Sequence, residues 1–209
     1  MNDRLAADIA GVRQAHRRLA ETMVDVTDDV ARRPSRLPGW TVGHVLTHLA
    51  RNADSVVRRL EGAVRDEVVD QYEGGYEGRA AEIEGGAGRA AVDLVADVLA
   101  SAAAVDAACD AMPEEAWPRY TRSVGGALLP AERLPFSRWR EVEVHHVDLG
   151  LGYGCRDWSD GFVAEELPRA LATVAGRLRD DAGRRQLLGW LLDRAPAPEA
   201  GALGLDPWG

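Results

Sequence analysis

The sequence contains no lysine, so all 25 basic residues are arginine, and they are outnumbered by 34 acidic residues. We attribute the missing lysine to a GC-rich coding bias. It also bears on function, because the glycine cluster at 85–88 is followed by no lysine and preceded by no predicted strand, which excludes a phosphate-binding or dinucleotide-binding loop. The formal net charge of −9 disfavours general binding to nucleic acid or to an anionic membrane surface.

Cysteine and long apolar runs are also scarce. The two cysteines, Cys109 and Cys155, are far apart and form no CxxC spacing, which argues against a disulfide scaffold and a cysteine-ligated zinc knuckle. No uncharged apolar run approaches the roughly 20 residues needed to span a bilayer, and the first residues do not resemble a signal peptide. We therefore expect a soluble, cytoplasmic protein with no membrane or nucleic-acid partner.

The dominant pattern in the sequence is helical. Apolar residues recur at helical steps and predict four long helices, at 5–30, 41–62, 89–110 and 135–149. Thr41 is a suitable N-cap for the second of them. Four long helices with one or two long connections are typical of a four-helix bundle. Strand–helix alternation is absent, which excludes a Rossmann fold.

Two connections are unusually long. The stretch 65–88 is acidic and rich in glycine, and we expect one short helix near 77–84 within it; long loops of this kind are often functional. The stretch 120–129, with two adjacent glycines, fits either a hairpin or an irregular crossover.

Two shorter helices are predicted after the bundle, at 162–178 and 184–194. We therefore divide the chain into a bundle, residues 1–154, and a C-terminal helical lobe and tail, residues 155–209.

The histidines are clustered. His44 and His48 are spaced i, i+4 and share one helix face, and Glu141 and His145 have the same spacing on the fourth helix. A catalytic zinc site needs three nitrogen or oxygen ligands and an open position, and bundle interiors commonly hold such sites. A single histidine is more often a core or surface residue than a ligand, and we interpret His16 in that way. The coincidence of two clusters favours a metal site.

Helical phase narrows the choice of ligands. Glu143 lies about 200° around the helix from Glu141, so the two carboxylates cannot face one ion. His146 falls on the apolar side of the fourth helix, which favours Glu141 with His145 over Glu143 with His146. Asp148 lies one turn beyond His145 and could orient it.

Two segments resemble the signatures of a known family. Residues 37–53 (LPGWTVGHVLTHLARNA) and 138–150 (RWREVEVHHVDLG) resemble the two motifs of the mycothiol-dependent maleylpyruvate isomerases, which belong to the DinB/YfiT-like zinc-binding four-helix bundles. The resemblance covers about residues 5–155. It implies an all-α DinB/YfiT-like bundle. Full-length relatives carry a sterol-carrier-like α/β domain after the bundle, whereas this chain has only some 55 residues there. We therefore expect a short, reduced C-terminal helical extension.

The resemblance also implies site residues. The metal, zinc or another divalent ion, is expected on His48, Glu141 and His145. Two active-site arginines of the family match Arg79 and Arg194, each on a short gapped stretch, and a solvated surface arginine is the alternative for both. His44 is assigned to cofactor binding, although the residue pattern alone leaves open a supporting role, a substrate contact or none.

The implied reaction is a cis–trans isomerisation with mycothiol as cosubstrate. A metal-bound thiolate adds to a maleylpyruvate-like enoyl keto acid, the former double bond rotates, and elimination gives the trans product. Arg79 and Arg194 would hold a substrate carboxylate. The alternatives are a mycothiol S-transferase that releases a stable conjugate, and a non-catalytic metal- or ligand-binding bundle. The sequence leaves monomer and homodimer undecided.

Overall fold

The computed structural model describes residues 2–199 and 203–206. The chain divides into two compact units, Met1–Trp158 and Ser159–Gly209. The elements of the first unit are α1 (Asp3–Met23), α2 (Asp28–Ala31), α3 (Val42–Val64), α4 (Gly75–Gly86), α5 (Ala91–Ala111), η1 (Glu114–Ala116), β1 (Tyr120–Arg122), β2 (Leu128–Pro130), η2 (Ala131–Arg133), α6 (Leu134–Asp148) and η3 (Cys155–Asp157). The second unit contains α7 (Asp160–Arg177) and α8 (Asp181–Leu191).

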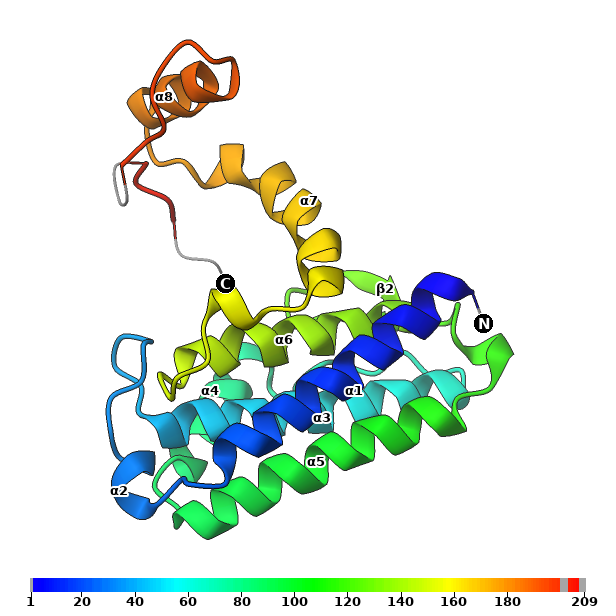
Figure 1. Ribbon diagram of the computed structural model, residues 1–209. Coiled ribbons are helices and arrows are strands. Elements are labelled where there is room, and N and C mark those ends of the chain that lie inside the picture. The colour runs from blue at the N-terminus through cyan, green and yellow to red at the C-terminus, as the bar shows by residue number, and fades with distance from the viewer. Residues whose placement is uncertain (1, 200–202, 207–209) are drawn as a thin grey trace. The chain divides into compact units, whose positions relative to one another are not determined.

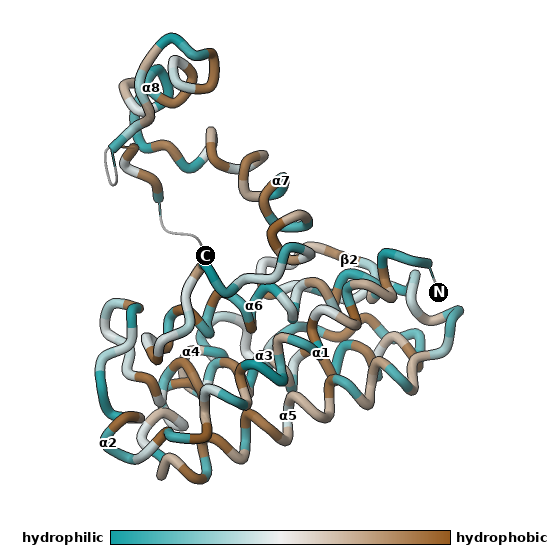
Figure 2. The backbone as a smooth tube through the Cα atoms, in the orientation of Figure 1, coloured by the Kyte–Doolittle hydropathy of each residue, from teal (hydrophilic) through white to brown (hydrophobic). Residues whose placement is uncertain are grey.

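The four long helices of the first unit, α1, α3, α5 and α6, lie side by side as the predicted bundle (Figure 1). Helix α3 packs against α4, α5 and α6, and α1 packs against α5 and α6. Apolar and polar residues alternate along each of these helices (Figure 2), as expected where one stripe faces a core. The predicted all-α bundle is confirmed. Among the described residues, no helix is both long and apolar enough to cross a membrane.

The first predicted helix, 5–30, is too long. Helix α1 ends at Met23, and the next residue, Val24, is 80% exposed. Thr27 then caps α2, its hydroxyl accepting a hydrogen bond from the Val30 backbone N–H at 3.4 Å. Because the threonine side chain can cap a new helix, the first helix ends at Met23 and a second one begins at Asp28, although the apolar spacing continues.

The start of α3 is fixed by a reciprocal cap, which confirms Thr41 as its N-cap. The Thr41 side chain accepts from the His44 backbone N–H, and His44 Nδ1 accepts from the Thr41 backbone N–H at 3.2 Å. Next to this cap, Gly43 allows the end of α4 to approach closely, because a Cβ there would lie 2.3 Å from the Ala87 carbonyl oxygen. Helix α4 replaces the short helix predicted at 77–84 and is longer at both ends.

The stretch 120–129 contributes to a hairpin, which settles the choice left open by the sequence. Strands β1 and β2 pair antiparallel, with Tyr120 opposite Pro130. The Arg122 backbone N–H donates to the Val69 carbonyl at 3.2 Å, and the Gln71 side chain accepts from the Val124 N–H at 2.9 Å. The hairpin thus supports the loop that leads into α4.

Candidate metal centre

The three predicted metal ligands meet inside the bundle. His48 comes from α3, and Glu141 and His145 come from α6. Glu141 Oε2 lies 3.0 Å from His48 Nε2 and 3.5 Å from His145 Nε2. One donor atom from each residue lies within 4.8 Å of the other two, and no other group of three such side chains occurs among the described residues.

This geometry fits a small divalent ion. Zinc bonds of about 2.0–2.1 Å in tetrahedral geometry hold neighbouring ligand atoms about 3.3 Å apart. The two separations from Glu141 Oε2, 3.0 Å and 3.5 Å, bracket that value. Two imidazoles and one carboxylate are also a donor set that zinc accepts, and three protein ligands leave a position for a further ligand.

The His145 ring lies between two carboxylates, those of Asp148 and Glu141. His145 Nδ1 donates to Asp148 Oδ2 at 2.8 Å, so Nε2 is the nitrogen that faces Glu141. Burial lowers the pKa of His145, but the hydrogen bonds to Asp148 and Glu141 and their charges outweigh it and raise that pKa to about 9. Without metal, this ring is an imidazolium at neutral pH.

The other two ligands are shifted differently. Burial, more than any other effect, lowers the pKa of His48 to about 4, so this imidazole is neutral at pH 7. Burial raises the pKa of Glu141, but hydrogen bonds to His145 and His48 outweigh it and hold that pKa well below its usual value. At neutral pH the centre therefore holds one carboxylate, one neutral ring and one ring that must lose a proton before it can bind metal.

Trp40, in the turn before α3, packs against two histidines of the site. The Trp40 ring meets His48 edge-on at 5.8 Å between centroids and stacks with His44 at 6.1 Å. His44 is already engaged, because Nδ1 completes the α3 cap and Nε2 lies 3.2 Å from Glu84 Oε2. Its assignment to cofactor binding stays a prediction.

Of the two predicted arginines, Arg79 lies beside the centre. It projects from α4, with Nη2 at 3.4 Å from His48 Nδ1 and its guanidinium 5.9 Å from the centroid of the Tyr72 ring. Arg194 belongs to the second unit, where it is exposed and donates to the Asp193 carbonyl at 3.2 Å. The substrate-binding role of both stays a prediction.

The sequence analysis missed a polar network that crosses the bundle core. Arg138, fully buried on α6, donates from Nη1 to Leu49 O at 2.8 Å and to Asn52 Oδ1 at 2.9 Å, and from Nε to His16 Nε2 at 3.2 Å. His16 Nδ1 in turn lies 3.1 Å from Asp106 Oδ1. The network joins α1, α3, α5 and α6, and it makes His16 a buried structural residue.

The opposite side of α6 confirms the predicted phase. Glu143 accepts hydrogen bonds from Trp139 Nε1 and from the Tyr153 hydroxyl. His146 stacks on the Tyr153 ring at 3.7 Å and lies 2.7 Å from Thr22 Oγ1. Neither Glu143 nor His146 belongs to the metal-ligand group. They anchor the chain that follows α6 to the bundle.

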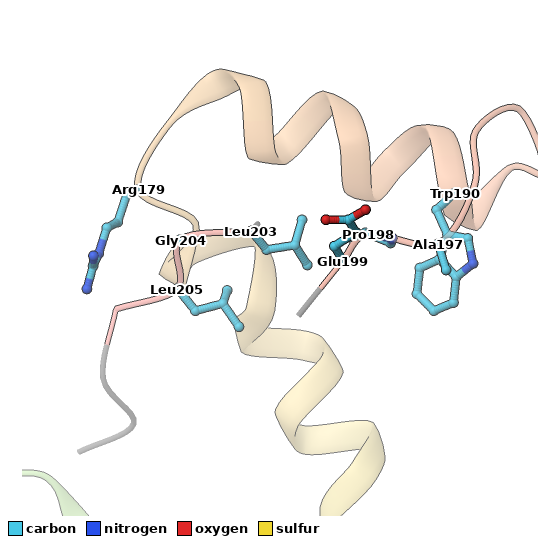
Figure 3. A pocket seen from close by; sticks show the side chains of 8 residues that line it. All are labelled: Arg179, Trp190, Ala197, Pro198, Glu199, Leu203, Gly204 and Leu205. Atoms are coloured by element: carbon cyan, nitrogen blue, oxygen red, sulfur yellow. The ribbon is translucent and has the colours of Figure 1, made fainter. Parts of the chain in front are cut away.

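The second unit contains a cavity of about 600 Å³ of its own (Figure 3). Its lining is Arg179, Trp190, Ala197, Pro198, Glu199, Leu203, Gly204 and Leu205. This set is mostly apolar and has no histidine or cysteine and only one carboxylate, so it offers no metal site. The group of His48, Glu141 and His145 is the better candidate.

Comparison with known proteins agrees with this geometry. The family model for the mycothiol maleylpyruvate isomerase N-terminal domain matches residues 12–150. A crystal structure of a mycothiol-dependent maleylpyruvate isomerase superposes with a TM-score of 0.73 at 26% identity over 77% of this chain, and a histidine-to-alanine mutant of such an enzyme gives the same values. This chain covers 66% of those chains, just under two thirds of their length. No curated protein sequence matches. Since the family model matches well over half of the sequence, the chain belongs to the mycothiol maleylpyruvate isomerase N-terminal domain family.

Proposed function

We propose that the protein is a metal-dependent cis–trans isomerase that uses mycothiol as cosubstrate and acts on a small, maleylpyruvate-like enoyl keto acid. The observation that carries the proposal is the convergence of His48, Glu141 and His145, with Glu141 3.0 Å and 3.5 Å from the two imidazoles, in a chain of this family. Two of the structures similar to this chain are mycothiol-dependent maleylpyruvate isomerases.

His48, Glu141 and His145 would hold zinc or another divalent cation. When bound, such a cation lowers the pKa of a coordinated thiol so that it is a thiolate at neutral pH. Asp148 keeps the Nε2 lone pair of His145 directed at the centre, by holding the proton on Nδ1.

The nucleophile comes from the cosubstrate. Cys109 is buried in the bundle core, and burial raises the pKa of its thiol to about 12, so it is not a usable thiolate. Cys155 is exposed in η3, outside the metal centre. Addition of the thiol sulfur to one carbon of the conjugated double bond leaves a single bond that rotates. Elimination of the same thiolate then restores the double bond in the trans form.

Arg79 would bind a carboxylate of the substrate. Its guanidinium lies beside His48 on the α4 side of the centre, where its planar fork can donate two hydrogen bonds to one carboxylate. For Arg194 the same role rests on the family resemblance alone.

The proposal is tested by following maleylpyruvate with metal-loaded protein, with and without mycothiol, by absorbance and by NMR. We expect formation of the trans isomer that requires the thiol. Equal rates without thiol would exclude the addition–elimination route. A stable thiol conjugate in the mass spectrum, with no trans product, would identify the protein as an S-transferase. Metal binding without either product would leave a non-catalytic binding bundle.

A further inference from the structure

A second arginine, Arg59, is buried on the face of α3 that carries His48. His48, Asn52, Ser55 and Arg59 follow one another at helical spacing, and all four are buried. Arg59 is only 3% exposed. Its Nε donates to the Ser55 carbonyl, one turn earlier, at 3.1 Å, so the side chain folds back along α3 toward His48.

This guanidinium has no direct ion-pair partner in the described part of the chain. Among the described residues, no carboxylate lies within ion-pair distance of Arg59; its contacts are the Ser55 carbonyl and, at 3.5 Å, the Ser55 hydroxyl. Arg51, on the same helix, contrasts with it, because Arg51 Nη2 lies 2.7 Å from Asp97 Oδ1. Burying a cation without a charged partner is unfavourable, and an anionic ligand at this position would supply the missing charge.

Arg59 also has N–H groups that make no hydrogen bond among the described residues. A guanidinium has five N–H groups, and the two contacts with Ser55 occupy two of them. Its Nη1 has no acceptor among the described residues. Unlike Arg138 Nη2, which is buried without a partner, Arg59 Nη1 is not completely shielded from solvent. The unused N–H groups of Arg59 are therefore able to donate to a further acceptor.

Arg59 belongs to the surroundings of the metal centre. The neighbouring Arg58 donates from Nη2 to the Gln71 carbonyl at 2.5 Å, which places this part of α3 against the segment that carries Tyr72. Burial lowers the pKa of Arg59 to about 10, and the charge of Glu141, a proposed metal ligand, acts in the opposite direction. Tyr72 is 4% exposed, and its ring lies under the guanidinium of Arg79, which contacts His48. The Tyr72 hydroxyl has no hydrogen-bond partner among the residues that the structure describes, and it too is not sealed from solvent.

We infer that Arg59 and the Tyr72 hydroxyl form a second anion-binding subsite of the centre, which takes one carboxylate of a short dicarboxylate substrate while Arg79 takes the other. The assignment of a substrate to this subsite rests on the proposed function. The subsite makes the site selective for molecules with two anionic ends, because a monoanion would leave one buried guanidinium without a partner. Arg59 acts here as a substrate-binding residue.

The test uses succinate, a dicarboxylate without a double bond, which can neither isomerise nor accept a thiol. Its affinity for the metal-loaded full chain is measured by calorimetry, without mycothiol. We expect Arg59→Met to weaken binding about tenfold or more and Tyr72→Phe about threefold, because charge-assisted hydrogen bonds to a carboxylate are lost. Arg59→Lys should retain part of the affinity. Arg51→Met, the matched change of a paired arginine on α3, should leave it unchanged.

Thermal unfolding separates binding from a structural role. Arg59→Met should unfold at the same temperature as the wild type or higher, because an unpaired buried charge is removed. Arg51→Met should unfold at a lower temperature. Equal succinate affinity in Arg59→Met and wild type, no succinate binding by the wild type, or a loss of affinity accompanied by clear thermal destabilisation would each overturn the inference. Because neither readout needs turnover, Arg59-dependent binding without isomerase activity would reject the proposed function and keep the subsite.

Discussion

His145 donates from Nδ1 to Oδ2 of Asp148 at 2.8 Å, three residues further along α6. A carboxylate in this position fixes which ring nitrogen carries the proton and which faces the metal centre. In the metal-free protein the same contact helps to hold a second proton on the ring. Asp148 would therefore both orient His145 as a metal ligand and raise the pKa of the proton that a metal ion must displace.

Metal binding at pH 7 should release close to one proton per chain. The pKa of His145 is raised to about 9 and that of His48 is lowered to about 4, so only His145 has a proton to lose. The apparent metal affinity should rise about tenfold per pH unit up to about pH 9, above which it should level off. Calorimetric titration with Zn²⁺ in two buffers of different ionisation enthalpy measures the protons released.

The variant Asp148→Asn tests whether the released proton comes from His145. It removes the hydrogen bond and charge that raise the pKa of His145, so the protons released at pH 7 should decrease. Above pH 9, where the wild-type ring has already lost its proton, the metal affinity should be about 10–100-fold below that of the wild type, because the ring is no longer oriented. Unchanged proton release in Asp148→Asn would mean that His145 is not the group displaced.

His48 and His44 form a matched pair for the ligand assignment. His48→Ala should abolish stoichiometric metal binding, because it removes one of three donors. His44→Ala should keep the metal but lose the reciprocal cap of α3, at a cost of about 1 kcal/mol in the free energy of unfolding. Metal analysis by mass spectrometry and urea unfolding of both variants provide the two measurements. Metal retained by His48→Ala would refute the ligand set.

The convergence of the three proposed ligands was predictable from the sequence, because residues one turn apart on a helix lie on the same face. Glu141 and His145 are one turn apart, and phase alone placed Glu143 and His146 on the other side, as the structure confirms. The family resemblance then selected His48. Asp148 was visible in the same way, since it lies within one turn of His145.

Other parts of the site depend on contacts that spacing does not encode. The series of polar residues on α3 that includes Asn52 and Arg59 was visible as polar positions in helical phase with His48, but only packing shows that they are buried. The three acceptors of Arg138 come from two other helices. The break after Met23 was missed because a local cap at Thr27 outweighed the periodicity.

Arg79→Ala should change substrate binding and metal binding in opposite directions. Arg79 Nη2 lies 3.4 Å from His48 Nδ1. Removing this cation should raise the KM for an anionic substrate about tenfold, because its carboxylate loses a charged donor. It should strengthen metal binding about twofold to fivefold, because a positive charge near a divalent ion is removed. Steady-state kinetics and a chelator competition measure the two effects, and an unchanged KM would leave Arg79 without a role in substrate binding.

The metal-free protein should lose stability on acidification below about pH 6.5. Burial, above all, lowers the pKa of His48 and of His146 to about 4, and burial lowers that of His16 as well. Between the ordinary histidine pKa of about 6.5 and pH 4 the unfolded chain binds more protons than the folded chain. The free energy of unfolding should therefore fall by up to about 1.4 kcal/mol per pH unit for each such group.

His145 acts in the opposite sense, because its folded pKa of about 9 gives stability that is complete below about pH 6.5 and is lost as the pH rises toward 9. Stability should thus be greatest near pH 6.5. Urea unfolding at a series of pH values measures this profile. His146→Gln, which removes one of the low-pKa rings, should flatten the acid side of the profile; an acid side as steep as the wild type's would assign the loss to other groups.

Arg138 should prove essential to both the fold and the spacing of the metal ligands. Arg138→Met keeps an apolar stem but leaves Leu49 O, Asn52 Oδ1 and His16 Nε2 without their donor. Buried acceptors that lose their partner are costly, so the free energy of unfolding should drop by about 2–4 kcal/mol.

The same substitution should weaken metal binding. Arg138 ties α6 to Asn52 one turn before Glu141, and Asn52 lies one turn after His48, so the bond fixes the separation of the two helices beside the ligands. Asn52→Leu should cost less in Arg138→Met than in the wild type, since the acceptor has already lost its donor. Urea unfolding of the four proteins of this double-mutant cycle, with a Zn²⁺ titration of each, measures both effects. Additive losses, or wild-type metal affinity in Arg138→Met, would show that the network stabilises the bundle without positioning the metal centre.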